Sequence, residues 1–481
     1  MSFIDLLIIC LYLIAMLAVG FWFLKKNQSA EDYYVSGRSM KPWHVGLSVV
    51  ATDVGGGFSI GLGGLGFVLG LSGSWMLLTG LIGAWLSAVV LIPKVHSLGA
   101  KHSWMSFPDL LKHFFNKPVF ILAAIFSLVG YLGFTSSQML AGAKLASAAF
   151  PDLSTNQLLV IMGFVAVLYT TVGGIKAVIY TDTVQWLILI IGLVFIGIPI
   201  GYIKLGGFDT IMDSITREMT SFSNVSWVQC VNWLVTIVPI WFIGMTLYQR
   251  IYASKSVKAA RKSWFIAGLF EYPVMAFLGV ILGLFGRVAA DQQMFAEFGY
   301  LSAAGMDPEL GLPLFLRMLM PVGFLGLMLA AYFSAIMSTA DSCLMAASGN
   351  LTHDLLNWSG KKNKLRFSRW LTMGLGALAL FIAWKMENVL DLMLKSYAFM
   401  VSGLFLPVIV ALFTKTRDSV AVLISMITGG LVTLVIPYLF EEIPYGFDPI
   451  IFGLTSSFAI YAILTVLRRE KMSRKSTRFG I

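Results

Sequence analysis

The chain has 481 residues, of which 58% are hydrophobic and only 12% are charged. Soluble domains carry about 25% charged residues, so this composition excludes an ordinary soluble protein. Apolar stretches of about 20 residues, long enough to cross the hydrocarbon core of a bilayer, recur along the chain and do not alternate as β-barrel strands do. The predicted fold class is therefore an all-α polytopic membrane protein.

The formal net charge of +10 comes from basic residues that gather in short connections between the apolar stretches. In a soluble protein this charge would favour a nucleic-acid partner, but here it indicates orientation in the lipid bilayer. Because basic connections stay in the cytoplasm, we expect the N-terminus outside and the C-terminus inside, in the plasma (inner) membrane. Neither nucleic acid nor an obligatory protein partner is predicted.

The apolar stretches predict thirteen transmembrane helices in a single domain over residues 1–481. They cover approximately residues 2–24, 43–69, 73–93, 118–149, 157–172, 180–203, 227–252, 264–288, 313–348, 367–385, 388–414, 419–440 and 449–467. Residues 468–481 are expected to form a cytoplasmic tail.

Several classes of membrane protein are disfavoured by the sequence. No GxxxxGK[ST] loop occurs, which argues against an ATP-driven pump. The polar residues inside the spans are too local to line a channel pore. We predict no catalytic residues, no enzyme activity and no organic cofactor, so an ion gradient is the expected source of energy. A membrane sensor for a solute is the alternative that does not transport.

The second span contains Asp53 followed by three glycines, Gly55 to Gly57. Three glycines beside a carboxylate predict that the helix breaks here, within the membrane. A broken helix frees backbone carbonyls to coordinate a cation, as in secondary transporters. Close helix packing on small residues is the alternative.

The ninth span ends in a segment rich in hydroxyl groups, 334–342. Positions 335, 338, 339 and 342 share one helical face, so a carbonyl and three hydroxyls can converge. Such neutral oxygen ligands suit a monovalent cation, because a divalent ion would require more carboxylates. The alternative is that the hydroxyls bond carbonyls of their own helix.

A third polar cluster, 169–185, places Asp182 about one turn inside the sixth span. Intramembrane charges usually mark paths of ions or substrates. Asp182 is also compatible with a role at the N-terminal end of its helix, where negative charge is favoured. The sequence leaves both interpretations open.

These segments together resemble the sodium:solute symporter family, which includes sodium-coupled proline, sugar, sialic acid, pantothenate and choline transporters. The resemblance covers nearly the whole chain. Its motifs are DYYVSGR (32–38), ATD (51–53), TVGG (171–174), YTDTVQ (180–185), QR (249–250) and SAIMSTADS (334–342). It implies a leucine-transporter-like core of two inverted five-helix repeats, at 43–203 and 227–414. One extra helix (2–24) precedes the core and two (419–467) follow it.

The resemblance also implies where sodium binds. The main site would use carbonyls of Ala51, Val54 and Ala335 with hydroxyls of Ser338 and Thr339. A second sodium, found in some members, would map to Asp182, Ser338, Asp341 and Ser342. Because Asp341 stands where some members have serine, a protonated site and proton coupling are alternatives, and the cofactor expected is one Na⁺ or two.

For the transported small-molecule solute, the family places the site midway across the bilayer. The candidates by position are Asp53, Gly55, Gly56, Phe58, Ser136, Gln138, Trp241, Ser396 and Tyr397. An amino acid or related small amine is the first expectation, and a monocarboxylate or vitamin acid the second. Lys395 has two interpretations, a partner for a solute carboxylate or an i to i+4 ion pair with Asp391, and the ion pair is favoured.

Overall fold

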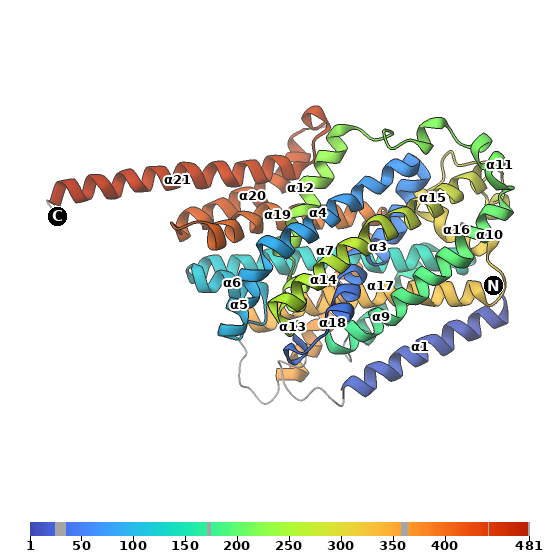
Figure 1. Cartoon of the computed structure of the whole chain (residues 1–481), viewed down its shortest axis with the longest axis horizontal. Coiled ribbons are helices and arrows are strands. Elements are labelled where there is room, and N and C mark those ends of the chain that lie inside the picture. Colours follow the sequence, from blue (N-terminus) through green and yellow to red (C-terminus); the bar gives the residue numbers. More distant parts are fainter. Residues whose placement is uncertain (25–34, 171–174, 357–363, 441, 480–481) are drawn as a thin grey trace.

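The computed structural model describes residues 1–24, 35–170, 175–356, 364–440 and 442–479, and its regular elements there are helices (Figure 1). The first half contains α1 (Phe3–Leu24), η1 (Ser36–Arg38), α3 (Pro42–Leu69), η2 (Gly70–Ser74), α4 (Trp75–Val90), α5 (Ile92–His102), α6 (Phe107–Phe114), α7 (Lys117–Ala149), α8 (Thr155–Thr170), α9 (Ile175–Gly192), η3 (Leu193–Gly197), α10 (Ile198–Lys204), α11 (Gly207–Ser214) and η4 (Arg217–Thr220). The second half contains α12 (Trp227–Ile243), α13 (Met245–Ala253), α14 (Val257–Leu269), η5 (Phe270–Met275), α15 (Ala276–Asp291), η6 (Ala296–Phe298), η7 (Pro308–Leu310), α16 (Gly311–Leu319), α17 (Phe324–Gly349), η8 (Asn350–Leu355), α18 (Lys364–Trp384), α19 (Val389–Phe413), α20 (Ser419–Leu439), η9 (Pro444–Gly446) and α21 (Pro449–Phe479). The all-α class is confirmed.

The number of transmembrane helices is a separate question. Within the described residues, 8 helical segments are long and apolar enough to span a membrane, or 9 if the bent pair α12 and α13 counts as one span. Three further apolar helices, at Phe3–Ala15, Thr155–Val167 and Trp370–Trp384, are shorter. Each of the thirteen predicted ranges overlaps one helix or a run of two or three consecutive helical elements, but the count of thirteen spans stays a prediction.

The break expected in the second span lies at Gly55 of α3. Its backbone angles, φ 43° and ψ −170°, are outside the helical region. A side chain is also excluded there, because a Cβ would lie only 2.8 Å from Thr339 Oγ1 on α17. Glycine therefore permits both the break and the close approach of α3 to α17.

Three interruptions were not predicted. The span at 227–252 bends by 44° between α12 and α13. The span at 264–288 contains η5, where Tyr272 has non-helical angles of φ −137° and ψ 123°. The range 313–348 is two helices, because Pro321 and Gly323, with φ 89°, separate α16 from α17. At the C-terminal end, α21 continues as a helix to Phe479, through much of the predicted tail.

Helix α17 forms the centre of the bundle. It is buried along nearly its whole length and packs against α3, α7 and α9, with α1 on its outer side (Figure 1). The hydroxyl-rich segment of α17 therefore faces the broken helix α3 and the Asp182 helix α9. This packing brings the three polar clusters of the sequence together.

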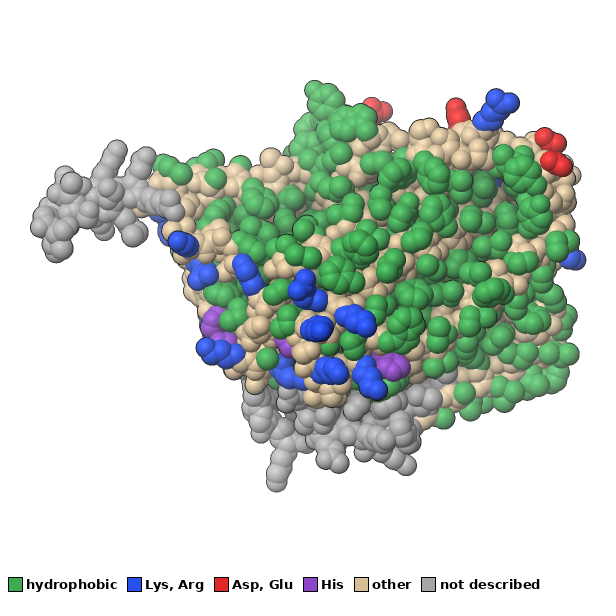
Figure 2. Space-filling model, in the orientation of Figure 1, with side chains coloured by type: hydrophobic (Ala, Val, Ile, Leu, Met, Phe, Trp, Pro, Cys, Tyr) green, Lys and Arg blue, Asp and Glu red, His purple; other side chains and the backbone are tan. Residues whose placement is uncertain are grey.

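The outer surface agrees with a membrane environment. Figure 2 shows hydrophobic side chains over most of the visible face, with Lys and Arg gathered at the lower left, near α5 and α13. Acidic side chains lie at the upper edge and at the opposite end. The chain is an integral membrane protein by this pattern, and the orientation of its termini stays a prediction.

Candidate functional site

Asp182 is the acceptor in a buried network between α9, α17 and α3. It accepts hydrogen bonds from Ser338 and from Ser48, the latter at 2.5 Å between Ser48 Oγ and Asp182 Oδ2. Arg250 of α13 lies 3.6 Å from the same carboxylate, and both side chains are almost completely buried. Asp182 is therefore compensated by a positive charge inside the protein.

Arg250 uses its remaining donors on neighbouring helices. It donates to Ser48 Oγ at 3.0 Å, Thr52 Oγ1 at 2.5 Å and the Thr246 carbonyl at 3.2 Å. It also reaches Ser342 Oγ at 3.4 Å. We call Ser48, Thr52, Asp182, Arg250, Ser338 and Ser342 the Arg250 network.

The sequence interpretation missed this role of Arg250. Arg250 was named only as part of the QR motif (249–250) and was given no role, whereas its side chain is fully buried. The signal was its position just inside the end of the 227–252 span, since an intramembrane arginine needs a partner.

Thr339 joins the two helices expected to hold sodium. Its hydroxyl lies 3.1 Å from the Ala51 carbonyl on α3 and 3.1 Å from the Ala335 carbonyl of its own helix. Three of the five predicted main-site residues thus meet at one point. Val54, three residues after Ala51, is buried. Ser338 donates its hydroxyl to Asp182.

The four residues predicted for a second sodium are divided. Asp182 and Ser338 are in contact, and Ser342 reaches them through Arg250. Asp341 instead accepts a hydrogen bond from Thr170 on α8. The neighbouring motif at 171–174 lies outside the described residues.

A second pair of acids lies farther along α3. The carboxyl of Asp53 lies within hydrogen-bonding reach of the Glu271 carboxyl and the Tyr397 hydroxyl. Asp53 is 5% exposed and Glu271 is 0% exposed. We call Asp53 and Glu271 the acid pair. Glu271 was missed from the sequence, although a glutamate inside an apolar span, followed by Tyr272 and Pro273, was the signal.

Of the other predicted solute residues, some form hydrogen bonds within their own helix and others lie against a neighbouring helix. Ser136 and Ser396 donate to carbonyls of their own helices, at 2.8 and 2.7 Å. Gln138 approaches the α3 break, since a Cβ at Gly55 would lie 3.3 Å from its Oε1. Trp241 is buried edge-on against Trp264, with 6.4 Å between ring centroids.

Two further candidates add little. Gly56 is held against Ile336, whose Cβ would lie 2.8 Å from a Cβ at this position. The Phe58 side chain lies outside the described residues.

The ion-pair interpretation of Lys395 is confirmed, because its Nζ lies 2.7 Å from Asp391 Oδ2. With 65% of its side chain exposed, Lys395 is at the surface.

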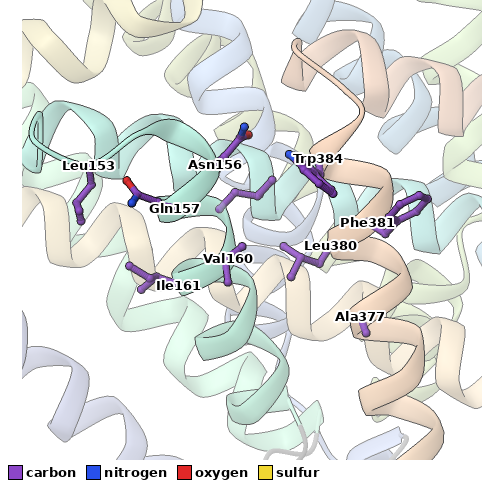
Figure 3. Close-up of a pocket in the computed structure, with 10 residues that line it drawn as sticks. Leu153, Asn156, Gln157, Val160, Ile161, Ala377, Leu380, Phe381 and Trp384 are labelled. Atoms are coloured by element: carbon purple, nitrogen blue, oxygen red, sulfur yellow. The ribbon is translucent and has the colours of Figure 1, made fainter.

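One groove lies away from all these residues. It has a volume of about 710 Å³ and is lined by α8 and α18, including Val160, Leu380 and Trp384 (Figure 3). The labelled side chains are mostly apolar, with Asn156 and Gln157 at one end. This composition fits a surface exposed to lipid rather than a site for a polar solute.

Comparisons with known proteins agree with this architecture. Two proline transporters of Bacillus subtilis (strain 168), the osmoregulated OpuE and the high-affinity PutP, are 27% and 28% identical over 88% and 89% of this chain, and 87% and 92% of their own. A sodium/glucose cotransporter of Vibrio parahaemolyticus is 24% identical over 97% of this chain and 91% of its own.

The fold is shared with a solved transporter. A Na⁺-coupled sialic acid symporter in a substrate-bound outward-open state aligns with a TM-score of 0.77 and 22% identity, over 97% of this chain and 98% of that chain. The shared fold agrees with the expected leucine-transporter-like architecture. The sequence pattern of the sodium:solute symporter family matches residues 33–429. The chain belongs to the sodium:solute symporter family.

Proposed function

We propose that this protein is a sodium-coupled secondary active symporter that imports a small amino acid or related amine by alternating access. The observation that carries the proposal is the meeting of Thr339 with the Ala51 and Ala335 carbonyls at the broken helix. Neutral oxygens from two helices can replace the water around a monovalent cation. An ion there would also hold α3 against α17, which couples its binding to the packing of the bundle.

The main sodium site in this proposal consists of Ala51, Val54, Ala335, Ser338 and Thr339. Its stoichiometry is one ion per cycle. The second site receives less support, because Arg250 already places a positive charge beside Asp182. A second cation would have to bind close to that guanidinium, which is electrostatically unfavourable.

The solute is proposed from the charges around the α3 break. Asp53 is buried beside another acid, so it attracts an ammonium group and repels an isolated carboxylate. This disfavours a monocarboxylate or vitamin acid. The proline transporters among the relatives also support an amino acid, although a sodium/glucose cotransporter is a relative as well.

Uptake into proteoliposomes tests the proposal. Purified protein is reconstituted, and radiolabelled L-proline, L-alanine and ethanolamine are offered with an inward sodium gradient or with potassium at the same pH. We expect accumulation above equilibrium only with sodium. Equal uptake in potassium would contradict sodium coupling, and uptake driven by a pH gradient alone would favour proton coupling.

A further inference from the structure

Among the residues that the structure describes, the acid pair has no positively charged partner. Apart from the contact between the two carboxyls, both oxygens of Glu271 and one oxygen of Asp53 are buried without a hydrogen-bond partner among the described residues. Arg250, the arginine that is buried among the described residues, pairs with Asp182 and not with either acid. Two carboxyls in contact within a low-dielectric interior repel each other unless a cation lies between them or one is neutralised.

The packing around Glu271 keeps its carboxyl in place. A Cβ at Gly80 of α4 would lie 3.0 Å from Glu271 Oε2, so only glycine leaves room for the acid. One turn further along α4, Gly83 faces the ring of Trp241, whose Cγ would lie 2.9 Å from a Cβ there. Glu271 and Trp241 therefore lie over the same face of α4.

Both acids are also next to backbone interruptions. Asp53 precedes the break at Gly55 by two residues, and Glu271 immediately precedes the non-helical Tyr272. An aromatic side chain lies beside them, because Tyr397 reaches Asp53, and its ring packs edge-on against Phe134 with 5.1 Å between centroids. Carboxylates beside aromatic rings are the usual surroundings of a bound organic cation.

We propose that Asp53 and Glu271 together bind the ammonium group of the transported solute, so that a solute without a positive charge is rejected. This inference rests on the proposed function and adds its recognition rule. Glu271 supplies the second carboxylate, from a different helix. An ammonium group with three donors can satisfy oxygens of both acids at once. We therefore expect the protein to distinguish two molecules of equal size when only one of them carries an ammonium group.

Matched pairs of ligands test this rule. L-alanine and L-lactate differ by an ammonium in place of a hydroxyl, and L-proline and tetrahydrofuran-2-carboxylate differ by a ring nitrogen in place of an oxygen. Melting temperatures of the purified protein are measured with each compound at saturating sodium. We expect stabilisation by the ammonium-bearing member of at least one pair, and by neither oxygen analogue. Stabilisation by an oxygen analogue equal to that by its amine would overturn the inference.

The Glu271→Gln variant isolates the second carboxylate. It keeps the shape of the side chain and removes its charge. The concentration of amine needed for half-maximal stabilisation should rise about tenfold or more. Stabilisation by sodium alone should be unchanged, which separates this result from a failure of sodium coupling. Unchanged amine affinity would overturn the role of Glu271.

A measurement without any solute keeps the inference testable if no member of the panel binds. Glu271→Gln should not lower the melting temperature of the ligand-free protein, because an amide at this position neither repels Asp53 nor has to be neutralised beside it. The matched control is Glu309→Gln. Glu309 is equally buried but pairs with Lys144 at 2.7 Å and accepts from two backbone N–H groups of α19. That variant should lower the melting temperature.

The comparison of melting temperatures between Glu271→Gln and Glu309→Gln distinguishes a ligand-binding from a structural role of Glu271. If Glu271→Gln destabilises the ligand-free protein as Glu309→Gln does, the Glu271 carboxylate has a structural role and the inference fails. The two variants are made in the full-length protein and compared at the same pH and sodium concentration.

Discussion

The Arg250 network and the acid pair are both buried clusters of charge on α3 and its neighbours, but they differ in balance. In the network one arginine meets one aspartate and the surrounding hydroxyls complete the hydrogen bonds. In the acid pair two carboxyls face each other, and three of their oxygens have no other donor in the described part of the chain. A satisfied cluster can hold helices together without a ligand, whereas an unsatisfied one needs a ligand to become stable.

The largest expected effect comes from breaking the satisfied cluster. Arg250→Met should reduce stability by about 3–5 kcal/mol, because it leaves Asp182 buried without its cation. Thermal unfolding in detergent measures the change. Adding Asp182→Asn should restore part of the loss, since the uncompensated charge is removed. A second substitution that lowers stability further would show that the two residues act independently.

An exposed ion pair is the control. Arg287 Nε lies 2.6 Å from Asp291 Oδ2, one turn apart on α15, and both side chains are about a third exposed. Arg287→Met should cost about 0.5 kcal/mol or less, because water screens such pairs. Equal losses in the two arginine variants would contradict the special status of the Arg250 network.

The acid pair is predicted to respond in affinity more than in stability. Asp53→Asn should weaken binding of the amine solute by about 2–5 kcal/mol, as expected when one partner of a buried charge pair is lost. Stabilisation by sodium should remain. Uptake with varied solute at saturating sodium measures the solute affinity, and uptake with varied sodium at saturating solute measures the sodium requirement. A raised sodium requirement with unchanged solute affinity would assign Asp53 to the cation instead.

The sequence predicted some of this arrangement and not the rest, for physical reasons. Gly55 to Gly57, shortly after Asp53, predicted the break in α3, because the conformational freedom of a backbone segment depends on the residues of that segment. The clustering of hydroxyls on one face of α17 was likewise predicted, because residues three and four positions apart share a helical face. The contact of Asp53 with Glu271, and of Asp182 with Arg250, joins residues more than 60 positions apart. Such contacts depend on how the helices pack, so the spacing of residues along the sequence could not predict them.

An intermediate effect is expected at the proposed sodium site. Thr339→Ala should raise the half-saturating sodium concentration about tenfold, equivalent to about 1.4 kcal/mol, since one ligand is removed. Ser338→Ala should act in the same direction. Sodium titration of uptake measures both, and Thr339→Ser, which keeps the hydroxyl, is the control. Unchanged sodium dependence in both alanine variants would show that the hydroxyls only bond protein groups.

The smallest effect concerns a third charged cluster, outside the spans. Asp109 of α6 accepts from the backbone N–H groups of Met105 and Ser106, at 3.0 and 3.1 Å, and lies 3.7 Å from His353 Nε2. Burial raises the pKa of Asp109, but the hydrogen bonds from His353 and the backbone outweigh it, so the pKa is lowered from its ordinary value. The ionised form is therefore favoured by folding.

The sign of the pH dependence follows from that direction. Because the folded-state pKa of Asp109 is below the unfolded value, its contribution is present above about pH 4 and is lost as the pH falls through the folded-state pKa. Asp109→Asn removes the charge but keeps an amide oxygen that can accept from the backbone of the α6 capping box, and should cost about 0.5–2 kcal/mol near neutral pH. The difference in melting temperature from the unmodified protein should shrink below pH 4. A difference for Asp109→Asn that is constant with pH would show that geometry alone, and not charge, makes Asp109 stabilising.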